Sequence, residues 1–281
     1  MTRSKISIYV AVFAVTIGSA AFLASCQKKD KTVDATEETG YASEHSTAEK
    51  AYNDAESISD QASTLTSGSS LGYKTTGLTS ACATVTRTTG SITVDFGATN
   101  CLCNDGRLRR GKILINYTGN YADSGSVRTI TFDNYYQNDN NVAGTKTVTN
   151  MGHNSLGQPY FNVTVNGIVT LSGGGTITTN WVRVRTWTDG YATLGDFSDD
   201  KYTVSGTGTL TRASGAIVNI AIPTATPLVF AAGCRWIEAG TMTYTLPSGL
   251  TRSINFGSTA TCDNQAILAL PSGVTYTITM P

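Results

Sequence analysis

Residues 161–171 read Phe-Asn-Val-Thr-Val-Asn-Gly-Ile-Val-Thr-Leu, and this stretch decides the fold class. Odd-numbered positions carry Phe, Val and Leu, and even-numbered positions carry Asn and Thr, apart from Gly167 and Ile168. Successive side chains of a β-strand point to opposite faces, so this alternation predicts a strand with one buried face and one solvated face.

Similar alternation recurs along the chain from Tyr73 onward, a region rich in Thr, Gly, Asn, Val and Ile. The further strand candidates are 113–117, 127–136, 176–188, 202–210, 242–246 and 276–280. Short turn signals such as Ser172-Gly173-Gly174 and Ser248-Gly249 separate them. We therefore predict an all-β domain over 73–281, an antiparallel meander of about a dozen strands. An extended sheet, a sandwich and a barrel-like closure remain open alternatives.

A different periodicity precedes this domain, over residues 47–67. Small and apolar residues recur there at three- and four-residue spacing, with charged residues between them, which predicts one short amphipathic helix. The apolar positions are Ala48, Ala51, Tyr52, Ala55, Ile58, Ala62 and Leu65. The helix is acidic, whereas membrane-surface helices are typically basic, so we expect it to dock on the β domain.

The N-terminus has the features of an export signal. Arg3 and Lys5 precede an uncharged apolar run from Ile6 to Leu23, and small residues then lead to Cys26. Residues 23–26, Leu-Ala-Ser-Cys, resemble the lipobox of bacterial lipoproteins, which implies removal of residues 1–25 and lipidation of Cys26. A membrane-spanning helix is the alternative interpretation of an apolar run of this length.

Residues 26–46 are predicted to form the lipid anchor and a flexible tether, because they are polar and poor in apolar groups. By resemblance to lipoprotein sorting rules, a residue other than Asp after the lipidated cysteine, here Gln27, favours the outer membrane. We expect an outer-membrane, lipid-anchored protein on the periplasmic face or the cell surface.

Charge is unevenly distributed although the formal net charge is zero. Residues 27–66 contain four Lys and nine acidic residues, whereas the chain from 67 onward contains fourteen basic and eleven acidic residues. The densest basic cluster is Arg107, Arg109, Arg110 and Lys112. Without regular aromatic residues among them, these side chains predict a solvated loop and no nucleic-acid partner.

Five cysteines follow Cys26, and an envelope location favours disulfides between them. They are Cys82, Cys101, Cys103, Cys234 and Cys262. Val-Asp-Phe-Gly at 94–97 and Ile-Asn-Phe-Gly at 254–257 begin two similar segments, each with a cysteine before and after it. The economical hypothesis is one bridge per segment, Cys82 to Cys101 or Cys103, and Cys234 to Cys262.

One strand carries a candidate ligand-binding face. Trp181, Arg183, Arg185 and Trp187 occupy alternate positions and should share a face. Such a row would stack on sugar rings and hydrogen-bond their hydroxyls; the alternative, which we favour, is a structural Arg/Trp ladder on the outer sheet face.

Catalytic chemistry has little support in the sequence. The two histidines are His45, in the expected tether, and His153, in a predicted loop, which argues against a histidine-based triad or metal site. A hydrolase would have to pair Glu238 with an aspartate, and the candidates are Asp196, Asp199 and Asp200. We expect no metal and no cofactor.

Several motifs together resemble a family of uncharacterised Bacteroidota lipoproteins, over most of the chain after Thr47. They occupy 82–86, 93–97, 101–107, 109–113, 132–136, 144–150 and 234–237. The resemblance supports the compartment and implies no activity or site residue. We expect a non-enzymatic binding or scaffolding lipoprotein, with the membrane as a partner through its lipid and a glycan or another envelope protein as the partner of the domain.

Overall fold

The computed structural model describes residues 35–64, 82–193, 196–234 and 236–280. The predicted signal peptide, Cys26 and the first part of the predicted tether lie outside these residues. The described chain forms one helix and one antiparallel sheet, which confirms the predicted fold class. Within the described ranges, no helix combines the length and apolar character that crossing a membrane requires.

The helix α1 spans Ala35–Thr64, and a 3-10 turn, η1, spans Phe197–Asp199. The strands of the first half of the sheet are β1 (Thr84–Thr88), β2 (Ser91–Asp95), β3 (Cys101–Leu102), β4 (Leu108–Thr118), β5 (Val127–Gln137), β6 (Asn140–His153), β7 (Pro159–Thr170) and β8 (Thr176–Asp189). The second half comprises β9 (Lys201–Thr211), β10 (Ile217–Ile222), β11 (Leu228–Ala231), β12 (Thr241–Thr245), β13 (Thr251–Asn255), β14 (Gln265–Ala269) and β15 (Thr275–Thr279).

The sheet is an open meander with two small additions. Its order is β1-β2-β4-β5-β6-β7-β8-β9-β10-β12-β13-β14-β15, while β3 pairs with β4 and β11 pairs with β9. β1 and β15 therefore form its two edges, and the strands do not close into a barrel. Among the three alternatives that the sequence left open, the structure is the extended sheet.

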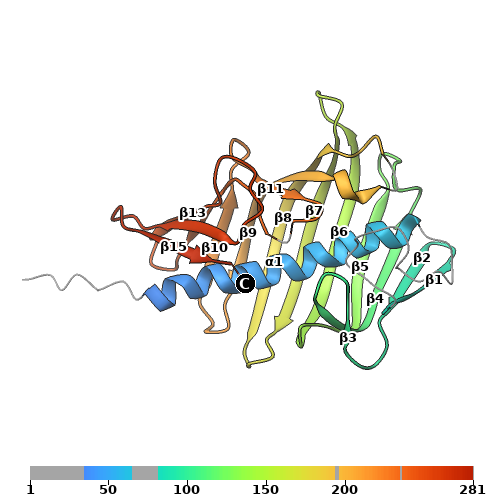
Figure 1. The fold of residues 1–281 in the computed structure, drawn as a ribbon, viewed down its shortest axis with the longest axis horizontal. Coiled ribbons are helices and arrows are strands. Elements are labelled where there is room, and N and C mark those ends of the chain that lie inside the picture. Colours follow the sequence, from blue (N-terminus) through green and yellow to red (C-terminus); the bar gives the residue numbers. More distant parts are fainter. Residues whose placement is uncertain (1–34, 65–81, 194–195, 235, 281) are drawn as a thin grey trace, which may run out of the picture. The chain divides into compact units, whose positions relative to one another are not determined.

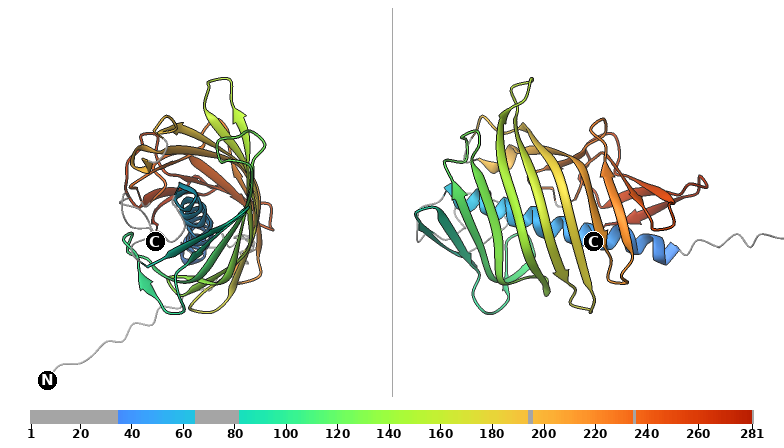
Figure 2. Two further views of the ribbon diagram at one scale, coloured as in Figure 1. Left: turned by 90° about the vertical axis from the view of Figure 1, so that its right-hand side faces the viewer. Right: turned by 180° about the vertical axis from the view of Figure 1, so that it is seen from behind.

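The sheet curves around α1, which lies across the strands on the concave side (Figures 1 and 2). The strand pattern at 161–171 is confirmed, because in β7 Phe161, Val163 and Val165 are buried and the intervening Asn and Thr are exposed. The predicted apolar positions from Ala48 to Ala62 are also buried, Ala48, Tyr52 and Ile58 completely, while Leu65 lies outside the described residues.

Two paired glycines allow close approaches, Gly144 between β6 and β7 and Gly167 between β7 and the helix. Gly144 in β6 has φ +100°, and a Cβ there would lie 2.2 Å from the carbonyl oxygen of Asn166. Its neighbour Gly167 lies directly beneath Tyr52, and a Cβ would meet the phenol ring at 2.2 Å. The Tyr52 hydroxyl donates to the Ala143 carbonyl at 2.7 Å, so the ring is held where only glycine leaves room for it.

The helix begins at Ala35 rather than at Thr47, so residues 35–46, expected in the tether, are helical. Non-local contacts hold this first part in place. Tyr41 stacks on Tyr244 of β12 at a centroid distance of 5.3 Å, and Arg212 bonds Glu44 at 3.1 Å. Neither partner is visible from the local sequence pattern.

Candidate functional site

The predicted ligand-binding row lies on β8, on the concave face beneath α1. Trp181, Arg183, Arg185 and Trp187 do share one face, as their alternation predicted. That face is not the outer one, however, because their relative exposures are only 3%, 4%, 8% and 4%. The expectation of an exterior ladder was wrong because α1, not solvent, covers this side of the sheet.

The Arg183 guanidinium is bound by a carboxylate of the helix. Its Nη1 donates to both oxygens of Glu49, at 2.7 and 2.8 Å. The guanidinium carbon also lies 4.4 Å from the centre of the Trp181 ring, and Trp181 meets Tyr52 edge to face at 5.9 Å. The guanidinium thus already holds the kind of anionic group that a ligand would offer.

A second helix carboxylate, Glu56, is shared by two strands. Lys146 of β6 approaches it at 2.5 Å and Arg185 of β8 at 2.7 Å. Burial favours the protonated acid, but the Arg185 and Lys146 charges outweigh it and hold the pKa of Glu56 below its ordinary value. Glu49 behaves in the same way: burial raises its pKa, but Arg183, His45 and Lys146 together outweigh burial and lower it.

Asp60 continues this row toward the end of the helix. It pairs with Arg128 of β5 at 2.9 Å and with Arg185 at 3.3 Å. Burial outweighs these two charges and raises the pKa of Asp60. From Glu49 to Asp60 the helix advances about 17 Å, and three strand spacings from β8 to β5 span about 14 Å. The row of carboxylates on α1 therefore spans about the same distance as the strands from β8 to β5, although Arg185 of β8 reaches both Glu56 and Asp60.

The basic cluster near β4 belongs to the same interface, which the sequence analysis missed. Arg107 pairs with Asp54 of α1 at 3.1 Å, and Arg109, with no exposed surface, donates to Asp105 at 2.7 Å. The predicted solvated loop is therefore wrong for Arg107 and Arg109. Arg110 and Lys112 do lie nearer the surface, paired with Asp139 and Asp95.

His45 was assigned to the tether, yet it is buried on α1 at 4% exposure. Its ring lies 5.9 Å from that of Trp181, and its Nε2 lies 3.5 Å from Glu49. Burial lowers the pKa of His45 to about 4; the nearby Glu49 opposes this shift and Arg183 adds to it. His45 is therefore neutral at pH 7 in the folded protein.

The space left between α1 and the β8 row is small. A cavity of about 20 Å³, bordered by Glu49, Lys146 and Arg183, is the size of a single water site. A sugar ring cannot enter this face while α1 is in place. The concave face is thus a filled interface within the domain.

The cysteines form the bridges predicted from the two similar segments. Cys82 bonds to Cys101, which decides between its two predicted partners, and Cys234 bonds to Cys262. Cys103 remains a buried thiol. The first bridge joins the residues before β1 to β3, and the second joins the residues after β11 to those between β13 and β14, so each bridge links strands that do not pair with each other in the sheet.

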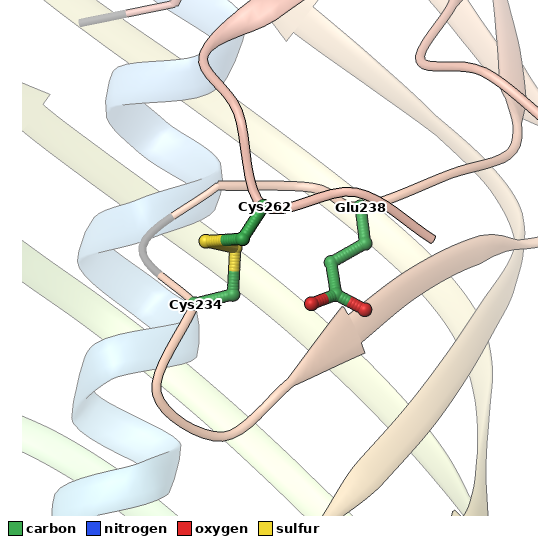
Figure 3. A group of neighbouring side chains, drawn as sticks. All are labelled: Cys234, Glu238 and Cys262. Carbon is green, nitrogen blue, oxygen red and sulfur yellow. A yellow bond between two sulfur atoms is a disulfide. The ribbon is translucent and has the colours of Figure 1, made fainter. Parts of the chain in front are cut away.

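Glu238 lies beside the second bridge, as Figure 3 shows. A carboxylate oxygen and the sulfurs of Cys234 and Cys262 lie within 4.8 Å of one another. In the bridged form the two sulfurs bond each other and are not thiolate ligands, so this group offers a metal one carboxylate.

The three aspartates proposed as partners of Glu238 serve local structure. Asp196 accepts from the Ser198 amide at 3.0 Å and caps η1, and Asp199 accepts from Thr193. Asp200 accepts from Trp187 Nε1 at 3.2 Å and from the Tyr202 hydroxyl at 2.9 Å, next to the start of β9. Burial raises the pKa of Asp200 to about 6, against these two hydrogen bonds.

Comparison of the chain with known protein families, with curated proteins and with solved structures finds no match. The resemblance to Bacteroidota lipoproteins therefore stays a prediction. Function has to be argued from the domain itself.

The helix carboxylates are the main residues that sequence reasoning missed, and a signal for them exists. Arg128, Lys146 and Arg183 occupy strand positions in phase with the buried residues Ile130, Val148 and Trp181. A basic residue at a buried strand position requires a buried partner. The acidic segment at 27–66 contains the carboxylates that could be these partners.

We predict that His45 makes stability fall on acidification. The unfolded chain protonates this histidine below about pH 6.5, whereas the folded protein resists protonation down to about pH 4, so the unfolded state binds more protons in that window. Between pH 7 and 5 the wild type should lose about 2 kcal/mol more free energy of unfolding than His45→Gln. Urea unfolding at both pH values measures the difference, and equal losses in the two proteins would contradict it.

Proposed function

We propose that this protein is a lipid-anchored component of the outer membrane whose domain is a non-enzymatic binding or scaffolding module. The lipobox-like residues before Cys26 support the anchor. The two disulfides fit an oxidising envelope compartment, where such bridges persist.

The exposed convex face of the sheet is the main support for a binding role. Because α1 fills the concave face, the convex face is the broad sheet surface left to solvent. Two uncharged cross-strand rows, made mostly of Thr, Ser and Asn, run across it. One row is Thr86, Thr93, Leu114, Thr131, Thr145, Asn166, Asn180, Thr209, Asn219, Thr245 and Thr251. The other is Thr88, Ser91, Asn116, Thr129, Thr147, Thr164, Val182, Thr207, Ala221, Thr243, Ser253, Ala269 and Thr275.

These rows offer a regular array of neutral hydrogen-bonding groups. Neighbours within a row lie about 5 Å apart, and the rows lie about 7 Å apart along the strands. Hydroxyls and amides both donate and accept, which suits a partner with many neutral hydroxyls. Val182, exposed by 64%, adds an apolar contact near the centre. We therefore propose an uncharged envelope polysaccharide as the partner, bound on this face and not on the Trp/Arg row.

The anchor is tested in cells by inhibiting lipoprotein signal peptidase with globomycin. We expect the unprocessed precursor to accumulate, because the inhibited peptidase is the enzyme that would cleave before Cys26. Cys26→Ser should lose incorporation of radiolabelled palmitate. Normal processing in the presence of globomycin would contradict the proposal.

The convex face is tested by removing hydroxyls without changing side-chain shape. We expect Thr164→Val combined with Thr207→Val to weaken binding to an array of neutral polysaccharides about thirtyfold, given roughly 1 kcal/mol for each of the two lost hydrogen bonds. Thr89→Val, in the turn between β1 and β2, is the matched control and should bind as the wild type does. Equal binding by the double variant and the wild type would show that the contact lies elsewhere. Wild-type protein that binds an envelope protein and no polysaccharide would contradict the proposed partner.

A further inference from the structure

Two hairpin turns near the end of the chain share almost the same sequence. Residues 246–251 read Leu-Pro-Ser-Gly-Leu-Thr, and residues 270–275 read Leu-Pro-Ser-Gly-Val-Thr. Their backbone hydrogen bonds are also alike. The carbonyl of Leu246 or Leu270 accepts from the amide of the turn glycine, and the amide of the same leucine donates to the carbonyl of the residue four positions later. Each turn thereby presents one aliphatic side chain to solvent, Leu250 at 50% exposure and Val274 at 48%.

Both turns lie at the end of the domain where α1 begins. Tyr41, in the second turn of the helix, stacks on Tyr244 of β12. Tyr244 pairs with Arg252 across the hairpin, and Leu250 precedes Arg252 by two residues, or about 7 Å along the strand. The β14–β15 hairpin is adjacent, because β13 pairs with β14. Figure 1 shows the hairpins of β13 and β15 on the side where the helix starts.

The two hairpins at this end are nearly free of charge, whereas the start of α1 beside them carries Glu37, Glu38 and Glu44, the last of which pairs with Arg212. From Ala239 to the last residue, the sequence contains Arg252 and Asp263 as its charged residues, and Arg252 is buried. The two tips themselves contain Pro, Ser, Gly and Thr around the exposed aliphatic residue. Contact with an apolar or interfacial environment would therefore not strip water from a charged group at either tip.

The length of chain before α1 determines what these tips can reach. Eight residues, 27–34, separate Cys26 from Ala35, and a fully extended chain of this length spans at most about 30 Å. A lipid on Cys26 would hold the start of the helix within that distance of the headgroups. Lys28, Lys29 and Lys31 lie in this segment together with Asp30 and Asp34, so its net charge of +1 attracts anionic lipids only weakly.

We infer that the end of the domain where α1 begins faces the bilayer, and that Leu250 and Val274 insert into its headgroup region. This inference rests on the proposed lipid anchor at Cys26. Two aliphatic tips are too little to hold a protein on a membrane without a second signal, so they orient a domain that the lipid already anchors. The strands then lie with the β1 edge far from the membrane and the convex face open to the envelope space.

The test uses the full-length lipidated protein in vesicles of phosphatidylethanolamine and phosphatidylglycerol, with and without brominated phosphatidylcholine. Single variants Leu250→Trp and Val274→Trp report contact, because bromine quenches tryptophan emission only at close range. The wild-type emission from Trp181, Trp187 and Trp236 is subtracted. We expect loss of most of the added emission and a shift to shorter wavelength at both tips.

Leu156→Trp is the matched control. Leu156 is an aliphatic residue, 78% exposed, in a turn with the same pattern of backbone hydrogen bonds. That turn connects β6 to β7 and lies at the opposite ends of the strands, since the sheet is an antiparallel meander. Its added emission should be unchanged by bromine.

Mass spectrometry of Cys26 and flotation of the vesicles, on the same sample, separate the possible failures. A lipidated, floating protein whose tips are not quenched, or in which Leu156→Trp is quenched equally, would overturn the inference and leave the proposed function standing. Tips that are shielded by a second copy, seen as crosslinked dimers without quenching, would also overturn it. Absence of the lipid from Cys26 would overturn the proposed function and the inference with it.

Discussion

The pairing of helix carboxylates with basic residues of the concave sheet face is the interaction on which the rest of the structure depends. Removing a charge from water is costly, and a buried pair breaks even only when both partners are present and well bonded. Removal of one partner from a buried pair typically costs about 3–5 kcal/mol. Glu56, shared by Lys146 and Arg185, makes two strands depend on one side chain of the helix.

This dependence explains why a small helix can organise a wide open sheet. An open sheet of this length needs cover on its apolar face, and α1 supplies alanines and aromatic rings for that purpose. The carboxylates add direction, because their basic partners lie on defined strands: Glu49 meets β8, and Asp60 meets both β5 and β8. The apolar side chains of α1 therefore cover the concave face, and its carboxylates determine where along the sheet the helix lies.

Filling the concave face has a consequence for function. Trp181, Arg183 and Arg185 are already engaged by the helix and by one another, so the residues most suggestive of a binding site serve the fold. The convex rows of threonine and asparagine have no such partner in the interior. With the proposed lipid on Cys26, the neutral outer face and the apolar hairpin tips would belong to a module held in a defined orientation.

Local pattern was enough to predict the strand at 161–171, the buried side of the helix from Ala48 to Ala62, and the pairing of Cys234 with Cys262. Each of these depends on periodicity or on similar neighbouring segments. The early start of the helix was not predictable in this way. Gly40 and the polar residues around it are weak helix formers, and their stability comes from Tyr244 and Arg212, both far along the chain.

The burial of Arg107 and Arg109 was missed for a related reason. A cluster of basic residues normally marks a solvated surface, and its partner Asp54 lies in a segment that reads as the polar side of a helix. The orientation of the Trp/Arg row was missed because alternation shows which residues share a face and not which face is covered. Matching the acidic helix with in-phase basic residues on the strands would have supplied that information.

Hydrogen exchange of the α1 amides tests the central claim most directly. If the buried ion pairs join helix and sheet into one unit, the amides from Glu49 to Asp60 should exchange only through global unfolding, with the same protection as the central strands β6 to β8. Glu56→Gln should lower the protection of helix and strands together. Exchange of the helix at a free energy well below that of the strands would show that α1 leaves the sheet independently, and would contradict the account.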